Sequence, residues 1–125
     1  MENYTIARKR DTPEVLMNFK EGIFSLKGRA LLEDSVDFFN PIFLKLKEYL
    51  KNPNSLTTIE LQFDYFNTTS FKLIIDILIL AKKASSADCK LVVKWFYEID
   101  DEDILMLGQD TARITGLPFE YKLVA

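Results

Sequence analysis

The chain has 125 residues, a formal net charge of −3 and 48% hydrophobic residues, including ten Phe. This length and composition predict one ordered domain over residues 1–125, and the negative charge removes the general attraction for phosphate backbones, so we expect no nucleic acid partner. The single cysteine, Cys89, cannot form an internal disulfide, and the first residues lack the apolar core of a signal peptide. We therefore expect a cytoplasmic protein without membrane insertion.

The first half of the chain predicts three short strands and a helix. The strands are expected at residues 4–7, 15–18 and 23–27, with the last two paired as a hairpin. The helix is expected from about Ser35 to Leu50, because apolar residues recur there at steps of three and four: Val36, Phe39, Phe43, Leu46 and Leu50.

The second half predicts a strand, a helix and a strand that together form a βαβ unit with parallel strands. These elements are expected at residues 57–63, 71–83 and 90–97, and the near-continuous apolar run of the last one is typical of a strand covered on both faces. A further helix is expected from Asp101 to Thr115, with Ile104, Leu107 and Ile114 facing inward, followed by a strand at 119–124. The fold class is therefore α/β, with a mixed sheet and about three main helices.

Three consecutive hydroxyl residues, Thr68, Thr69 and Ser70, lie between the strand at 57–63 and the helix that follows. Asn, Ser and Thr favour helix N-caps, because their side-chain oxygens accept from the free backbone N–H groups of the first turn. Capping by Thr69 and Ser70 is the simplest interpretation. The alternative is a phosphate acceptor at the start of the helix, and these residues alone favour the cap.

The acidic run at 98–103 is the other group with chemical potential. The chain has no histidine, which removes imidazole-based triads and histidine zinc sites, and Cys89 has no evident activating base. Carboxylates can hold Mg²⁺ or Ca²⁺, but the run lacks the spacing of a calcium loop, so a helix cap and a solvated edge are favoured. We expect no catalytic residue, metal or cofactor. Because the ends of parallel strands share one sheet edge, the run and Thr68 should lie on the same edge, where a partner would bring basic groups.

Two motifs together resemble the SiaC family of bacterial regulatory phosphoproteins. They are Asp64-Tyr65-Phe66-Asn67-Thr68-Thr69-Ser70 and, one helix later, Lys94-Trp95-Phe96-Tyr97-Glu98-Ile99-Asp100-Asp101-Glu102-Asp103. The early Thr12-Pro13 and the segment Phe38-Phe39-Asn40-Pro41 resemble further pieces of that family. The resemblance implies a fold similar to the STAS domain of anti-anti-sigma factors.

The resemblance also implies a partner switch without catalysis of its own. The family's threonine is phosphorylated by a SiaB-like Ser/Thr protein kinase and dephosphorylated by a PP2C-type phosphatase, and it maps onto Thr68, with Thr69 and Ser70 as second choices. The unmodified form binds and activates a diguanylate cyclase, so the phosphate controls cyclic-di-GMP synthesis and biofilm behaviour. The partner-binding surface is expected to include Asp64, Tyr65, Asn67, Thr69, Ser70, Asp100, Asp101 and Asp103.

Two other functions stay open at this point. One is a small metal-dependent enzyme that uses the acidic edge Asp100–Asp103, and the other is a constitutive scaffold whose hydroxyls only cap a helix. The stretch at 29–34, Arg-Ala-Leu-Leu-Glu-Asp, departs from the pattern that is typical of the family, which leaves the identity of the output partner open.

Overall fold

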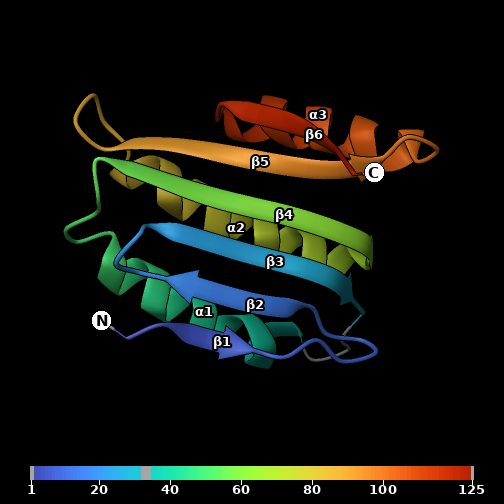
Figure 1. Cartoon of the computed structure of the whole chain (residues 1–125), viewed down its shortest axis with the longest axis horizontal. Helices are drawn as coiled ribbons and strands as arrows, with labels where there is room; N and C mark the ends of the chain where they lie inside the picture. Colours follow the sequence, from blue (N-terminus) through green and yellow to red (C-terminus); the bar gives the residue numbers. More distant parts are fainter. Residues whose placement is uncertain (1, 32–34, 125) are drawn as a thin grey trace.

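The computed structural model describes residues 2–31 and 35–124 and shows one mixed sheet covered by helices (Figure 1). The elements follow one another as β1 (Tyr4–Ile6), β2 (Glu14–Asn18), β3 (Ile23–Ala30), α1 (Ser35–Tyr49), β4 (Leu56–Phe66), α2 (Thr68–Ala84), β5 (Lys90–Glu98), α3 (Glu102–Thr115) and β6 (Phe119–Val124). This arrangement confirms the predicted α/β class with three helices.

The strands lie in the sheet in the order in which they occur along the chain. Strand β2 pairs antiparallel with both β1 and β3, which confirms the predicted hairpin. Strands β3, β4, β5 and β6 are parallel to one another, which confirms the βαβ unit built from β4, α2 and β5. All four parallel strands therefore end at one edge of the sheet.

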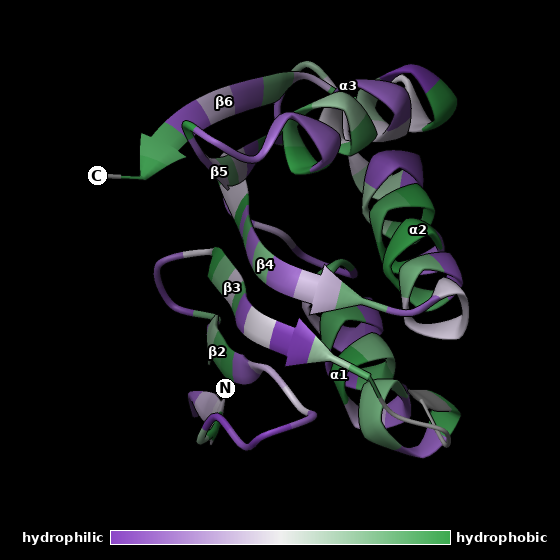
Figure 2. Cartoon of the chain, turned by 90° about the vertical axis from the view of Figure 1, so that its right-hand side faces the viewer, coloured by the Kyte–Doolittle hydropathy of each residue, from purple (hydrophilic) through white to green (hydrophobic). Residues whose placement is uncertain are grey.

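All three helices pack on one face of the sheet, with α2 between α1 and α3 (Figures 1 and 2). The prediction that the strand at 90–97 is covered on both faces is therefore wrong. Only its alternate residues Leu91, Val93 and Trp95 are buried beneath the helices, whereas Val92 and Phe96 on the other face are half-buried. An apolar run alone does not distinguish a strand between two helical layers from a strand whose outer face is partly sheltered by its neighbours.

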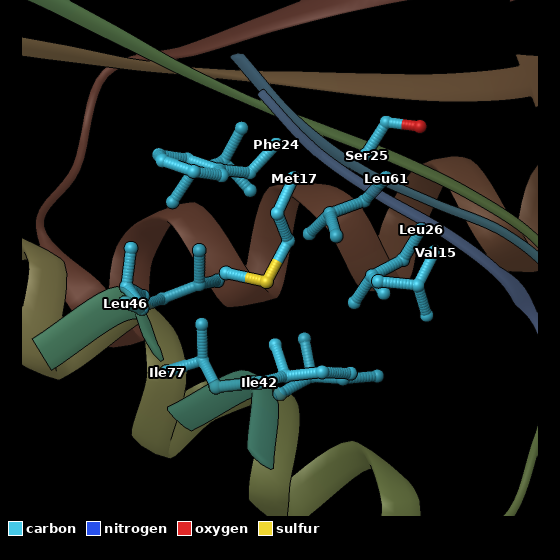
Figure 3. A pocket seen from close by; sticks show the side chains of 12 residues that line it. Val15, Met17, Phe24, Ser25, Leu26, Ile42, Leu46, Leu61 and Ile77 are labelled. Carbon is cyan, nitrogen blue, oxygen red and sulfur yellow. The ribbon is translucent and has the colours of Figure 1, made fainter. Parts of the chain in front are cut away.

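The core between sheet and helices is tightly filled. Figure 3 shows Val15, Met17 and Leu26 from the sheet converging on Ile42 of α1 and Ile77 of α2. The space that they enclose is about 20 Å³, room for a single water molecule.

Each of two predicted apolar helix faces contains one residue that is exposed, whereas the other residues expected on the α1 face, Phe39, Phe43, Leu46 and Leu50, are buried or pack against the core. Val36 is 56% exposed and lines a hollow between α1 and α2, and the buried face of α1 is formed by Phe39, Ile42, Leu46 and Tyr49. In α3, Ile104 and Leu107 pack against the core as predicted, but Ile114 is 62% exposed. In both helices the apolar residues extend around more of the helix than the sheet can cover.

Helix α3 is fixed to the sheet through Trp95. The indole nitrogen Nε1 of Trp95 donates to the carbonyl oxygen of Ile104 at 2.9 Å, and a Cβ atom at Gly108 would lie only 2.6 Å from the indole ring. At the other end of α3, the Lys82 Nζ donates to the carbonyl oxygen of Thr115 at 2.7 Å, and Gly116 ends the helix with a φ of 69°. These contacts set the position of the α3 N-terminus beside the end of β4.

Candidate functional site

Strands β4 and β5 separate at the edge where the parallel strands end. Their pairing runs from Leu56 opposite Lys90 to Leu61 opposite Trp95, although both strands continue beyond these residues. The separation is visible in Figure 2 and leaves a hollow of about 380 Å³, which we call the edge cleft. Its lining residues are Gln62, Phe63, Asp64, Phe96, Tyr97, Glu98, Asp101, Ile104 and Val124.

A second hollow of about 250 Å³ shares Asp64, Asp101 and Ile104 with the edge cleft and adds other residues of β4 and α3. Its further lining residues are Tyr65, Phe66, Asp103 and Leu107. The structure thus brings Asp64 of β4 together with Asp101 and Asp103, which follow it in the sequence only after α2 and β5. Asp100 is exposed and lines neither hollow.

Asp101 serves both α3 and the edge cleft. Its side-chain oxygen Oδ1 accepts from the backbone N–H of Ile104 at 3.0 Å, which confirms the predicted N-cap. Glu102 and Asp103 in the first turn carry the charge that the positive end of the helix dipole favours. Among the residues that the structure describes, no group of three or more His, Cys, Asp or Glu side chains is placed to hold a metal ion.

Asp64 is paired with Arg8, a residue that the sequence analysis missed. The Nη2 atom of Arg8 lies 2.5 Å from Oδ2 of Asp64, with both side chains about half exposed. Gly28 pairs with Phe63 and the next residue pairs with Tyr65, so Asp64 is the extra residue of a bulge. The only available signal was the basic run at 8–10, Arg-Lys-Arg.

Gly28 makes the contact between Arg8 and Asp64 possible. Its φ of +126° is a conformation that other residues rarely adopt, and a Cβ atom there would lie 3.0 Å from Nε of Arg8. The guanidinium group therefore lies close to the backbone of β3 and extends to the bulged Asp64. A cation of the chain itself thus offsets part of the negative charge at this edge.

The three hydroxyl residues occupy different environments at the start of α2. Asn67 is the N-cap, because its Oδ1 accepts from the backbone N–H of Ser70 at 2.9 Å. The prediction that Thr69 and Ser70 cap the helix is therefore wrong, since the helix begins one residue earlier, at Thr68. Thr68 and Thr69 are exposed, whereas Ser70 is fully buried. The side chains of Thr68 and Thr69 are therefore accessible from solvent without opening the helix.

The remaining predicted contact residues differ in exposure. Tyr65 is 59% exposed at the end of β4 and lines the second hollow, so its ring is accessible to a partner. Asn67 is half-buried. Together with the buried Ser70 it shapes the start of α2 more than it offers surface.

No helix within the described residues is long and apolar enough to cross a bilayer.

Comparison with known proteins supports the motif resemblance. Residues 6–124 match a family model described as SiaC family regulatory phosphoprotein. An uncharacterized protein of Pseudomonas aeruginosa is 24% identical over 119 residues, which cover 95% of this chain and 94% of that protein.

Solved structures show the same fold. The crystal structure of apo-SiaC from Pseudomonas aeruginosa has a TM-score of 0.87 at 23% identity, with 98% of this chain and 99% of that chain covered. A chain in the crystal structure of the diguanylate cyclase SiaD in complex with its activator SiaC, from the same organism, has a TM-score of 0.90 at 22% identity, with 97% and 99% covered. On the family match over nearly its whole length, the chain belongs to the SiaC family of regulatory phosphoproteins.

Proposed function

We propose that this protein is a phosphorylation-controlled partner switch. In its unmodified form it binds and activates a diguanylate cyclase in the cytoplasm, a partner kinase releases it by phosphorylating Thr68, and a PP2C-type phosphatase restores it. The family is one of regulatory phosphoproteins, and the SiaC of Pseudomonas aeruginosa is the activator in a complex with the cyclase SiaD. The proposal rests above all on the exposure of Thr68, the first residue of α2. Only Asn67 separates Thr68 from β4, whose last residues line the second hollow together with Asp101 and Asp103.

Electrostatics supports release by the phosphate itself. A phosphate adds about −1.5 to −2 charge, and the helix N-terminus compensates only about 0.3 to 1 kcal/mol of its cost. Arg8 already pairs with Asp64, while Asp101 and Asp103 form no ion pair within the described residues. Burying an uncompensated phosphate against a partner costs several kcal/mol, and about 1.4 kcal/mol is a tenfold change in affinity. No conformational change is required for release.

Phosphosite mapping with the kinase tests the choice of Thr68. We expect the Thr68→Val variant to take up no phosphate and to keep binding the cyclase, because valine has nearly the shape of threonine without its hydroxyl. The matched control, Thr69→Val, should be phosphorylated normally. Intact-mass and phosphopeptide analysis measure both. Phosphate on Thr69 or Ser70 in the parent chain, or undiminished labelling of Thr68→Val, would contradict the assignment.

The partner-binding surface that we propose surrounds Thr68 and the two hollows. It comprises Asp64, Tyr65, Asn67, Thr69, Ser70, Asp100, Asp101 and Asp103, with Asn67 and Ser70 acting through the shape of the helix start. The carboxylates should attract a basic patch on the cyclase in the unmodified state and repel a phosphate added at Thr68.

The charge of Asp103 tests this surface. We expect Asp103→Asn to weaken cyclase binding about two- to tenfold at low salt and to reduce its salt dependence, because exposed charges are screened beyond about 8–10 Å. Glu102→Gln is the matched control, since Glu102 lies in the same helical turn and lines neither hollow. Asp101 is left intact because it caps the helix. Titration across a salt series measures the effect, and equal curves for the two variants would show that the hollow carries no partner contact.

A further inference from the structure

Strand β6 is the outer strand of the sheet, and among the described residues its outward edge has no backbone partner (Figure 1). It pairs with β5 without interruption over six residues, from Phe119 to Val124, with no bulge and no proline. The opposite edge strand, β1, has only three residues. A regular, uninterrupted edge is a template for pairing with another strand.

The ladder with β5 determines which backbone groups of β6 face outward. The N–H of Val93 donates to the carbonyl oxygen of Pro118 at 3.0 Å, and Val93 is opposite Phe119. In a parallel ladder each residue bonds to the two residues that flank its opposite number, so Glu120 and Lys122 direct their peptide groups toward β5. The peptide groups of the alternate residues, Phe119, Tyr121 and Leu123, therefore face outward.

The side chains of β6 divide into a charged face and an apolar face. Glu120 and Lys122 share the face away from the helices, where their charged groups are 3.3 Å apart and about half exposed. On the helix side, Phe119 and Tyr121 pack against the core, while Leu123 is 54% exposed. One strand thus carries one acidic residue, one basic residue and an uncovered leucine.

We propose that β6 pairs antiparallel with β6 of a second copy of this chain, about a two-fold axis at Tyr121. In that register Glu120 lies opposite Lys122 of the second copy, and the symmetry repeats the pair. Leu123 then lies opposite Phe119 on the apolar face. The sheets of the two copies join into one.

Electrostatics selects this register over its neighbours. The outward peptide groups of one copy must hydrogen-bond to the outward peptide groups of the other, so one strand can shift along the other only in steps of two residues. A shift of one step in either direction places Glu120 opposite Glu120 or Lys122 opposite Lys122. Like charges directly opposite each other destabilise strand pairs, and opposite charges stabilise them. In the proposed register the charged residues also occupy the non-hydrogen-bonded positions, where the two strands are closest, at about 4.5 Å between Cα atoms.

The dimer should be weak, because one strand edge is small compared with the roughly 1,200–2,000 Å² of a stable interface. The proposal is independent of Thr68 and of the cyclase, so it stands or falls separately from the proposed function. Sedimentation equilibrium of the full chain at concentrations up to about 1 mM is the measurement, and a concentration-dependent monomer–dimer equilibrium is expected. A parent chain that stays monomeric throughout overturns the proposal.

Charge reversal tests the register. Glu120→Lys and Lys122→Glu should each weaken self-association roughly tenfold, because each variant places like charges opposite each other twice. An equimolar mixture of the two variants should recover association as a heterodimer, since all four charges are then complementary. Glu48→Lys and Lys51→Glu are the matched controls, because they make the same charge changes at an exposed ion pair between the last turn of α1 and the turn that follows it, and they should associate like the parent.

Two further results decide the outcome if a single variant is unstable. Circular dichroism melts check that each variant is folded, and the doubly swapped chain, Glu120→Lys with Lys122→Glu, keeps the composition of the parent and should dimerise. A monomeric but folded double swap overturns the proposal. So do single variants that associate as tightly as the parent, or a mixture that associates no better than its components.

Discussion

Asn67 caps the first turn of α2, because its side-chain oxygen accepts a hydrogen bond from the backbone N–H of Ser70. We expect Asn67→Ala to lower the free energy of unfolding by about 0.5–2 kcal/mol, because an N–H group of the first turn loses its acceptor. Thr69 is exposed within the same turn, so Thr69→Ala should change stability by no more than about 0.5 kcal/mol. Urea denaturation compares the two variants. If Thr69→Ala lowers the free energy of unfolding more than Asn67→Ala does, the Thr69 hydroxyl and not Asn67 is the cap of the helix.

Residue identities at the site were partly predictable. The sequence placed Thr68 at a strand-to-helix junction and Asp101 at a helix cap, because both roles depend on neighbours within four residues. Arg8 was not found, because it meets Asp64 across 56 residues of sequence. A contact of that range depends on the order of the strands and on the bulge, and neither leaves a local pattern.

At the level of elements, the contact between α3 and β5 depends on Gly108. Replacing it with Ala puts a Cβ atom about 2.6 Å from an indole ring that is almost fully buried. Overpacking of this kind costs about 1–3 kcal/mol, which exceeds the gain of about 1 kcal/mol in helix propensity. We therefore expect Gly108→Ala to lower the free energy of unfolding and to shift the fluorescence of Trp95, the single tryptophan.

Gln109→Ala is the control for that substitution, since Gln109 is exposed on the same helix and should tolerate alanine. Urea denaturation followed by fluorescence measures both variants. If Gly108→Ala is as stable as the control, α3 can move away from the sheet at little cost, and its N-terminus is then less firmly placed beside the edge cleft.

Element boundaries show where local patterns stop being informative. Alternation predicted the strand at 57–63, but β4 continues to Phe66, because the bulge at Asp64 interrupts the alternation without ending the strand. The helix that was predicted to begin at residue 71 begins in the structure at Thr68, for a related reason. Asn67 ends the strand and caps the helix at once, which leaves no loop between them.

For the whole molecule, the single-domain organisation stays a prediction with a direct test. The buried hydrophobic residues form one cluster with contributions from the sheet, α1 and α2, and the partly buried Ile104 and Leu107 of α3 pack against it. We therefore expect cooperative two-state unfolding, in which Trp95 fluorescence and far-ultraviolet circular dichroism give the same urea midpoint. Separate midpoints would show that the β1–β3 side and the β5–β6 side unfold as different units.

The sequence by itself determined the order and type of the elements, the parallel βαβ unit, the family and the position of Thr68. These properties follow from the period of the hydrophobic pattern, from capping residues and from contiguous motifs, which are local in the chain. Only the tertiary structure decided that the helices cover one face of the sheet, that Ser70 is buried while Thr68 and Thr69 are exposed, and that Arg8 pairs with Asp64 beside the edge cleft. Burial and ion pairing depend on contacts between segments that are distant in the sequence, and the packing of the whole chain determines which of these contacts form.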